Sequence, residues 1–291
     1  MVPGISSQIF LPQRLTTGLL DFLAGSGAQV IELFARRNHF DYTDRQQMRE
    51  LAQWFDGNGV AATLHAPLTS DADFSRHSSP NVNLVDLDKG RRIVAMDEVK
   101  RAIEAAEYIP MATCVLHLGL REDRWSEHVQ EHSLVAVEHL KAFAAPLGVR
   151  LLLENLRNEI ATPEHLLEIL RIGHFDSCGI CLDVGHAYLS DLGVRKTMEL
   201  LAARAGEVHL HDNHGPDAQG DEHLWPASGS ERPSKLGAGT LDWVEAYGLL
   251  KALPADTPGV LEIKDTQTES GDDAGRMARE VFSHWQRLRE A

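Results

Sequence analysis

Eight short apolar runs alternate along this chain with longer stretches of helical periodicity, and this alternation limits the folds that the chain can adopt. The runs are rich in Val, Ile and Leu and nearly continuous, as strands covered on both faces should be. They occupy residues 5–10, 29–35, 61–67, 113–119, 150–156, 179–186, 207–213 and 259–264. The pattern therefore predicts a parallel sheet of eight strands.

The stretches between the runs have the pattern of amphipathic helices. In one of them, residues 89–109, Ile93, Met96 and Val99 recur at helical spacing and are expected on the buried face. The charges of residues 97–107 are expected on the solvated face. Comparable patterns lie at residues 43–59, 126–148 and 162–173, and near residues 194–205, 240–252 and 271–290.

Strands that alternate with a similar number of helices predict a single (β/α)8 TIM barrel over residues 1–291. A doubly wound sheet is the main alternative, but no G-x-G-x-x-G motif follows the first run. We find no linker and no low-complexity tract. Residues 213–239 form a long loop, and a loop of that length is usually functional or mobile.

The charge balance bears on the class of partner. A formal net charge of −15 argues against tight nucleic-acid binding, which depends on Lys and Arg contacts to phosphates. The 15 histidines are a high number and direct attention to metal ligands. The N-terminal segment does not resemble a signal peptide, and no apolar run is long enough to span a bilayer. We therefore expect a soluble cytoplasmic protein without a membrane partner.

The cysteines do not indicate a disulfide framework. Cys114, Cys178 and Cys181 are three in number, which favours a reducing compartment. Cys178 and Cys181 form a C-x-x-C pair, but a zinc ribbon would need a second such pair. We expect all three to be small buried apolar residues.

Polar side chains occupy the carboxyl ends of six consecutive runs. In a barrel these ends converge on one rim, which is where active sites lie. The side chains at the run ends are His65, His117, Glu154, Asp183, His209 and Glu262, with His186 and His211 close behind.

A metal ion would resolve the electrostatic conflict among these side chains. Glu154, Asp183 and Glu262 would repel one another at a shared rim, and a divalent cation removes that repulsion. Mixed imidazole and carboxylate donors suit Zn, Mn, Co or Fe better than Ca. Asp221 and His223, two residues apart in the long loop, could complete a second or third metal position.

The motifs LLLEN, CLDVGHA, VHLHDN, DEH, LGAGTLDW and LEIK, in this order, resemble the xylose isomerase-like TIM-barrel superfamily. The resemblance covers roughly residues 5–265. The superfamily includes sugar and sugar-phosphate isomerases and epimerases, inosose dehydratases, and apurinic endonucleases of the endonuclease IV type.

The resemblance implies roles for individual residues. Glu154, Asp183, His209 and Glu262 match the four ligands of the single-metal isomerases and epimerases, with Glu154 and Glu262 as the catalytic base and acid. His186 matches a histidine that binds metal or substrate. The endonuclease IV branch uses nine ligands for three zinc ions, and its further positions are matched by His65, His117, Asp221 and His223.

The sequence departs from the family on one side of the site. Many members have Gly-Glu-Gly before the Asp-Trp pair, whereas this chain has Gly237-Ala238-Gly239. About ten extra residues also separate His223 from these glycines. The substrate pocket on this side is therefore not predicted by the resemblance.

Two functions follow, and a third class stays open. The leading hypothesis is a divalent-metal-dependent isomerase or epimerase of a sugar, sugar phosphate or related polyol, with His186, His211 and Glu32 as substrate contacts. The alternative is a phosphodiester hydrolase of the endonuclease IV type with a multinuclear zinc site. The expected cofactor is one to three ions of Zn, Mn, Co or Mg. The third class is a binding protein that has the barrel but no turnover. For the oligomeric state, a homodimer stays open.

Overall fold

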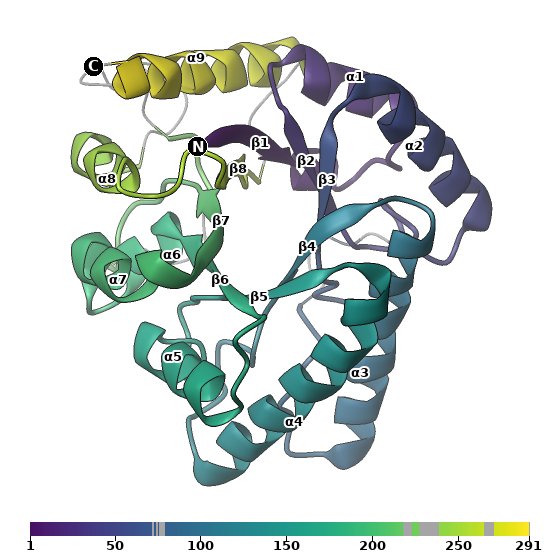
Figure 1. The fold of residues 1–291 in the computed structure, drawn as a ribbon, viewed down its shortest axis with the longest axis vertical. Coiled ribbons are helices and arrows are strands. Elements are labelled where there is room, and N and C mark those ends of the chain that lie inside the picture. The colour runs from purple at the N-terminus through teal and green to yellow at the C-terminus, as the bar shows by residue number, and fades with distance from the viewer. Residues whose placement is uncertain are drawn as a thin grey trace.

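The eight predicted strands form one closed parallel barrel in sequence order, surrounded by helices, as Figure 1 shows. The computed structural model describes residues 1–71, 73, 75, 79–217, 223–226, 239–264 and 271–290. The first strand pairs with the second and with the eighth, which closes the cylinder. The predicted (β/α)8 architecture is therefore confirmed, and the doubly wound alternative is wrong.

The strands are short, and each of the last six ends at or just before a polar residue of the site. Their bounds are β1 Val2–Ser6, β2 Val30–Phe34, β3 Ala61–His65, β4 Met111–Leu116, β5 Arg150–Glu154, β6 Gly179–Asp183, β7 Ala205–Leu210 and β8 Pro258–Leu261. In register, Asp183 of β6 lies opposite His209 of β7, and Glu154 of β5 lies opposite Cys181 of β6. Neighbouring strands thus bring their terminal side chains to the same rim.

The helices pack around the outside of the barrel (Figure 1). Within the described residues they are α1 Thr17–Gly25, α2 Arg45–Asn58, α3 Lys89–Ile103, α4 Glu127–Ala144, α5 Pro163–Ile172, α6 Val184–Leu189, α7 Gly193–Leu201, α8 Trp243–Leu250 and α9 Gly271–Glu290. Short 3-10 helices occupy Ser7–Phe10, Glu104–Glu107, Ala145–Leu147 and Ala202–Arg204. None of the helices in the described part of the chain combines the length and the apolar character needed to cross a bilayer.

Two local predictions differ from the structure. The first strand was expected at residues 5–10, but it ends at Ser6, and residues 7–10 turn into a 3-10 helix. The Ser6 hydroxyl caps that helix by accepting the amide N–H of Gln8. Helices α1 and α6 were not predicted, and α6 begins at Val184, inside the run 179–186 that was expected to be a strand.

The face of α3 that packs on the barrel also differs from the prediction. Ile93 was expected inside but is 52% exposed, whereas the carboxylate of Glu98 was expected outside and is buried. Glu98 accepts hydrogen bonds from Arg37, which follows β2, and from Tyr42. A buried carboxylate with such partners is stable inside, and the periodicity of apolar residues alone does not reveal those partners.

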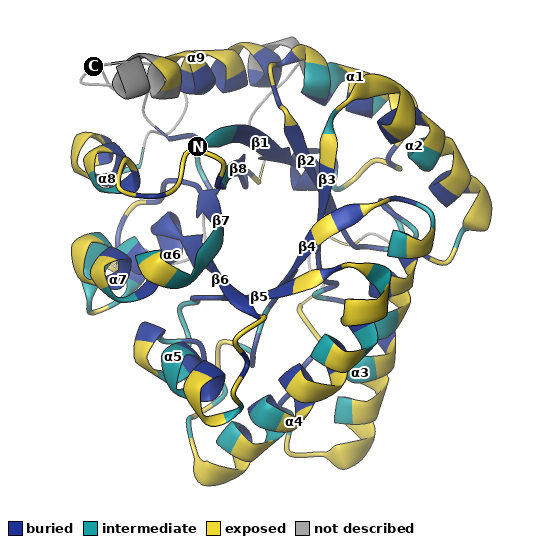
Figure 2. Ribbon diagram, in the orientation of Figure 1, coloured by how far each residue is buried: buried dark blue, intermediate teal, exposed yellow. Residues whose placement is uncertain are grey.

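The strands form the buried centre of the molecule, as the dark blue barrel in Figure 2 shows. Val115, Leu152 and Cys181 form a separate apolar cluster. All three cysteines are buried and without a disulfide, as predicted. The apolar centre supports a rim on which the polar side chains gather.

Candidate metal centre

The carboxyl ends of β5 to β8 bring together the four residues that the resemblance implies as ligands of a single metal. One donor atom each of Glu154, Asp183, His209 and Glu262 lies within 4.8 Å of the others. The Nδ1 atom of His209 is 3.3 Å from Glu154 Oε1 and 3.5 Å from Glu262 Oε2. All four side chains are buried.

Asp183 is held in place from both sides. It ends β6 and caps α6, where its carboxylate accepts the amide N–H of His186. Asn155 donates to the main-chain oxygen of Asp183 and accepts its N–H, both at 2.9 Å. The Oδ2 atom of Asp183 is buried and has no hydrogen-bond partner among the described residues. A bare buried carboxylate oxygen beside further carboxylates and an imidazole is what a divalent cation would satisfy, so these residues fit a metal.

Neighbouring imidazoles balance the charge of the carboxylates in this cluster. Burial alone would raise the pKa of Glu154, but the His117 and His209 imidazoles hold it well below its usual value. Burial would likewise raise the pKa of Glu262, which His223 and His209 instead lower. The imidazoles thus keep both carboxylates charged, a role that a bound cation would take over.

A second group of ligand atoms shares Glu154 with the first. Glu154 Oε2 lies 2.9 Å from Nε2 of His117 and 3.5 Å from Nε2 of His65. His65 ends β3 and His117 follows β4 directly, so the two rings converge on the same carboxylate. Burial would lower the pKa of His65, but the bond to Glu154 and the nearby glutamates raise it to about 9.

Glu32 lies elsewhere than predicted. It was expected at the rim as a substrate contact, but it is fully buried in the middle of β2. Its Oε2 atom is 3.0 Å from Nε2 of His209, on the side of the ring opposite the nitrogen that faces Glu154 and Glu262. A carboxylate on the far nitrogen of a ligating imidazole fixes its orientation and tautomer, so Glu32 is suited to position His209.

A second buried carboxylate, Glu207, was not singled out in the sequence. It lies on β7 and accepts hydrogen bonds from Thr63 at 3.2 Å and from Thr113 at 2.8 Å. Burial raises its pKa. Its place two residues before His209 on the same strand is the signal that could have identified it, because both side chains then share one face of the strand.

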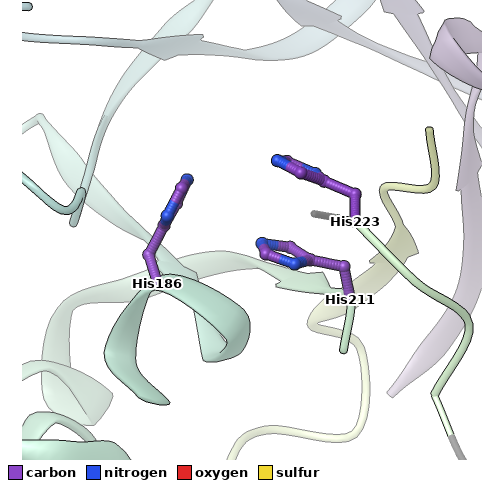
Figure 3. Close-up of side chains that lie close together, drawn as sticks. All are labelled: His186, His211 and His223. Carbon is purple, nitrogen blue, oxygen red and sulfur yellow. The ribbon is translucent and has the colours of Figure 1, made fainter. Parts of the chain in front are cut away.

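A third group consists of His186, His211 and His223, whose rings lie together in Figure 3. His186 is in α6, His211 follows β7, and His223 belongs to the described segment 223–226. Asp221, the other loop residue predicted as a ligand, lies outside the described residues. The structure therefore brings together every predicted ligand that it describes, in three adjoining groups.

Asp212 organises this side of the rim, a role that its place in the sequence does not reveal. Its main chain exchanges two hydrogen bonds with Leu224, at 2.7 and 2.8 Å, which places His223 beside His211. Its carboxylate accepts from Trp243 Nε1 and from the amide N–H of Leu241. A Cβ on Gly239 would lie 2.1 Å from Asp212 Oδ1, so this position of the former Gly-Glu-Gly motif needs glycine.

Comparisons with known proteins agree with this architecture. The chain is 27% identical over 271 residues to an uncharacterized protein of Methanocaldococcus jannaschii. The aligned region covers 90% of this chain and 83% of that protein. A D-tagatose 3-epimerase-like protein has the same fold, with a TM-score of 0.76, 23% identity and coverage of 100% of this chain and 98% of that one. The IolI protein with a bound zinc atom gives a TM-score of 0.78 at 17% identity, covering 98% of each chain.

A family model described as the xylose isomerase-like TIM barrel matches residues 20–288. This match extends over nearly the whole chain and agrees with the motifs that carried the resemblance. The protein belongs to the xylose isomerase-like TIM-barrel family.

Proposed function

We propose that this protein is a divalent-metal-dependent isomerase or epimerase of a sugar, sugar phosphate or related polyol. The observation that carries the proposal is the buried cluster of Glu154, Asp183, His209 and Glu262 at the barrel rim. The fold shared with a D-tagatose 3-epimerase-like protein supports sugar chemistry. The bound zinc of the IolI protein supports a metal in this kind of barrel.

In the proposed reaction, Glu154 and Glu262 move the proton. Glu154 ends β5 and Glu262 follows β8, so they approach the site from different sectors of the barrel. A divalent ion held by the cluster would polarise the carbonyl and a neighbouring hydroxyl of the substrate. One carboxylate then removes the proton from the carbon beside the carbonyl, and the other returns a proton to the opposite face or to the adjacent carbon. The reaction is redox-neutral and needs no further reactant.

Proton exchange with solvent tests this proposal directly. The protein, loaded in turn with Zn²⁺, Mn²⁺, Co²⁺ and Mg²⁺, is incubated in D₂O with ketoses, aldoses and their phosphates. We expect deuterium at the carbon next to the carbonyl of one substrate class, detected by NMR, together with the epimer or isomer. Glu154→Gln and Glu262→Gln should lower this exchange by at least about 100-fold, the range of general acid–base catalysis.

Glu159→Gln is the matched control, because Glu159 is a half-exposed carboxylate in the loop after β5 that accepts hydrogen bonds from Arg124 and from the amide N–H of Trp125. It should leave the exchange rate unchanged. Loss of exchange in all three variants would indicate general damage to the rim. Absence of exchange in the metal-loaded wild type with every sugar would contradict the proposal.

A second candidate function is a metal-dependent phosphodiester hydrolase. The specific observation in its favour is that Glu154 faces His65 and His117 through Oε2 and His209 through Oε1. A carboxylate shared in this way can bridge two metal ions, which is the arrangement that clamps a phosphoryl group in two-metal hydrolases. Incision of duplex DNA that contains an abasic site, with no exchange into any sugar, would favour this function over the first.

A further inference from the structure

Helices α3 and α4 border a groove on the outer surface of the barrel. The two helices lie side by side in Figure 1, and the groove between them has a volume of about 590 Å³. Ile93 of α3 and Val135 of α4 both line it and are 52% and 51% exposed. The lining also includes Leu84, Met96 and Ala136. Two neighbouring helices thus share an apolar surface, which differs from the scattered exposed apolar residues of an ordinary surface.

The apolar pattern of α3 continues into this groove. Ile93, Met96 and Val99 recur at helical spacing, but of these only Val99 is fully packed on the barrel, at 1% exposure. Ile93 and Met96 line the groove instead. The apolar stripe of a helix is normally buried against another element of structure. Figure 2 shows that the outer surfaces of both helices are largely exposed, so the stripe is left for a partner outside the barrel.

The two walls of the groove differ in charge. Among the described residues that line it, the α3 wall carries more cations than anions, with Lys89, Arg92 and Lys100 against Asp97. The α4 wall carries the anion Glu131 beside two histidines, His132 and His139. A partner with charges of one sign would meet like charges on one of the walls. A second copy of this chain presents both an α3 and an α4, so it can match both walls at once.

Twofold symmetry determines how two copies would fit together. In a parallel barrel each helix returns from the end of one strand to the start of the next, so α3 and α4 run in the same direction. A twofold axis along the groove places α3 of each copy over α4 of the other. Lys89 and Glu131, both toward the amino ends of their helices, then face each other across the interface.

We propose that this protein forms a homodimer through the groove between α3 and α4, with α3 of one protomer on α4 of its partner. The interface covers Ile93 and Val135 of both copies at its apolar centre, and the charged side chains surround them, as in other protein interfaces. The proposal goes beyond the sugar reaction and does not depend on it, because the metal centre lies inside each barrel.

Sedimentation equilibrium of the full chain over a range of concentrations tests the proposal. We expect the wild type to approach twice the 32.2 kDa mass of one chain as the concentration rises. Val135→Lys places an unpaired cation in the apolar centre and against the basic wall of the other copy. It should therefore raise the dissociation constant of the dimer by at least about 100-fold.

Val244→Lys is the matched control. Val244 is 64% exposed on α8, away from the groove, so this variant should form dimers as the wild type does. Both valines are exposed in a single chain, and thermal unfolding should show that neither substitution changes the stability of the monomer by much.

Charge reversal tests which helices face each other. Lys89→Glu and Glu131→Lys each create a like-charge contact twice, because the symmetry repeats it, and each should weaken the dimer by about 10-fold or more. Both side chains are exposed, so the fold should tolerate the changes. A one-to-one mixture of the two variants restores opposite charges at both contacts. The mixture should therefore associate as tightly as the wild type.

The outcomes that would overturn the proposal are distinct. A wild type that stays monomeric at every concentration would exclude the dimer. Val135→Lys dimers as tight as those of the wild type would show that the copies associate through another face. If the two charge variants do not recover association when mixed, α3 does not lie on α4 of the other copy.

Discussion

At the scale of single residues, the site depends on which side of the His209 ring each carboxylate occupies. Nδ1 faces Glu154 and Glu262, and Nε2 faces Glu32, with Glu207 further away at 3.8 Å. Two of these carboxylates are thus placed to share a metal with His209. Glu32 is placed to orient the ring, a role that usually changes metal affinity more than it changes the fold.

Glu32→Gln should therefore weaken binding of Zn²⁺ or Mn²⁺ at the carboxylate cluster by about 10- to 100-fold. The amide keeps the size of the side chain and can still accept from Nε2, but it lacks the negative charge that makes the imidazole a stronger donor. Competition with a chelating dye measures the affinity.

Glu207→Gln is the matched control, because burial raises the pKa of Glu207 and favours its neutral form, which an amide mimics. It should change the metal affinity far less than Glu32→Gln. Equal affinities in Glu32→Gln and the wild type would show that Glu32 does not act through His209.

The sequence identifies the rim residues better than those beneath them. His65, Glu154 and Asp183 each end a strand, so the end of an apolar run marks them. Glu32 and Glu207 lie within strands, where a carboxylate looks like an interruption of the apolar pattern. Their partners, Thr63, Thr113 and His209, come from other strands, and only the closed barrel brings them into contact.

At the scale of elements, an ion pair between half-buried Arg37 and the buried carboxylate of Glu98 joins α3 to the segment after β2. Glu98, 1% exposed, accepts two hydrogen bonds from Arg37, at 2.8 and 2.6 Å, and one from Tyr42. Burial would raise the pKa of Glu98, but Arg37 and Tyr42 lower it. The charged carboxylate is thus stabilised by folding, and α3 is fixed in rotation about its axis.

Glu98→Gln should lower the free energy of unfolding by about 2 kcal/mol near pH 7, since hydrogen bonds to charged groups contribute about 1.5–3 kcal/mol each. A carboxylate whose pKa is lowered by folding stabilises the fold at pH values above its unfolded-state pKa. This contribution is lost as the pH falls. The difference between wild type and variant should accordingly shrink below about pH 4. Urea unfolding at several pH values measures it.

Arg101→Ala is the control on the same helix, because Arg101 contacts the same carboxylate from a side chain that is 52% exposed. Arg101→Ala should lower the free energy of unfolding by less than about 1 kcal/mol. If the two variants lower the free energy of unfolding equally, the pair of Glu98 and Arg37 does not hold α3 in place. The same follows if the effect of Glu98→Gln does not depend on pH.

The elements also show where sequence patterns stop being informative. The long amphipathic helices were predictable because apolar spacing and terminal glycines agree, as in α2, which ends before Gly59; its N-cap is Asp44, one residue after the expected start at residue 43. Helix α6 was not predictable, because it begins directly after β6 and its N-cap is the ligand candidate Asp183. The face of α3 was misassigned because ion-pair partners outweigh apolar periodicity there.

At the scale of the whole molecule, the barrel converts strand order into a ring of ligands. Candidate ligands from the β3 to β8 sectors come from residues almost two hundred positions apart, His65 to Glu262, and lie in adjoining groups. The alternation of runs predicted this closure and hence the rim. It could not predict the division of the ligands into oxygen-rich and all-imidazole groups, because that division depends on how the segment at His223 pairs with Asp212.

Anomalous diffraction from crystals grown with Zn²⁺, recorded on both sides of the zinc absorption edge, shows whether a metal ion lies at the barrel rim. We expect a peak about 2.0–2.3 Å from one donor atom each of Glu154, Asp183, His209 and Glu262. The same four side chains with no peak between them, in crystals that show zinc elsewhere on the surface, would contradict it.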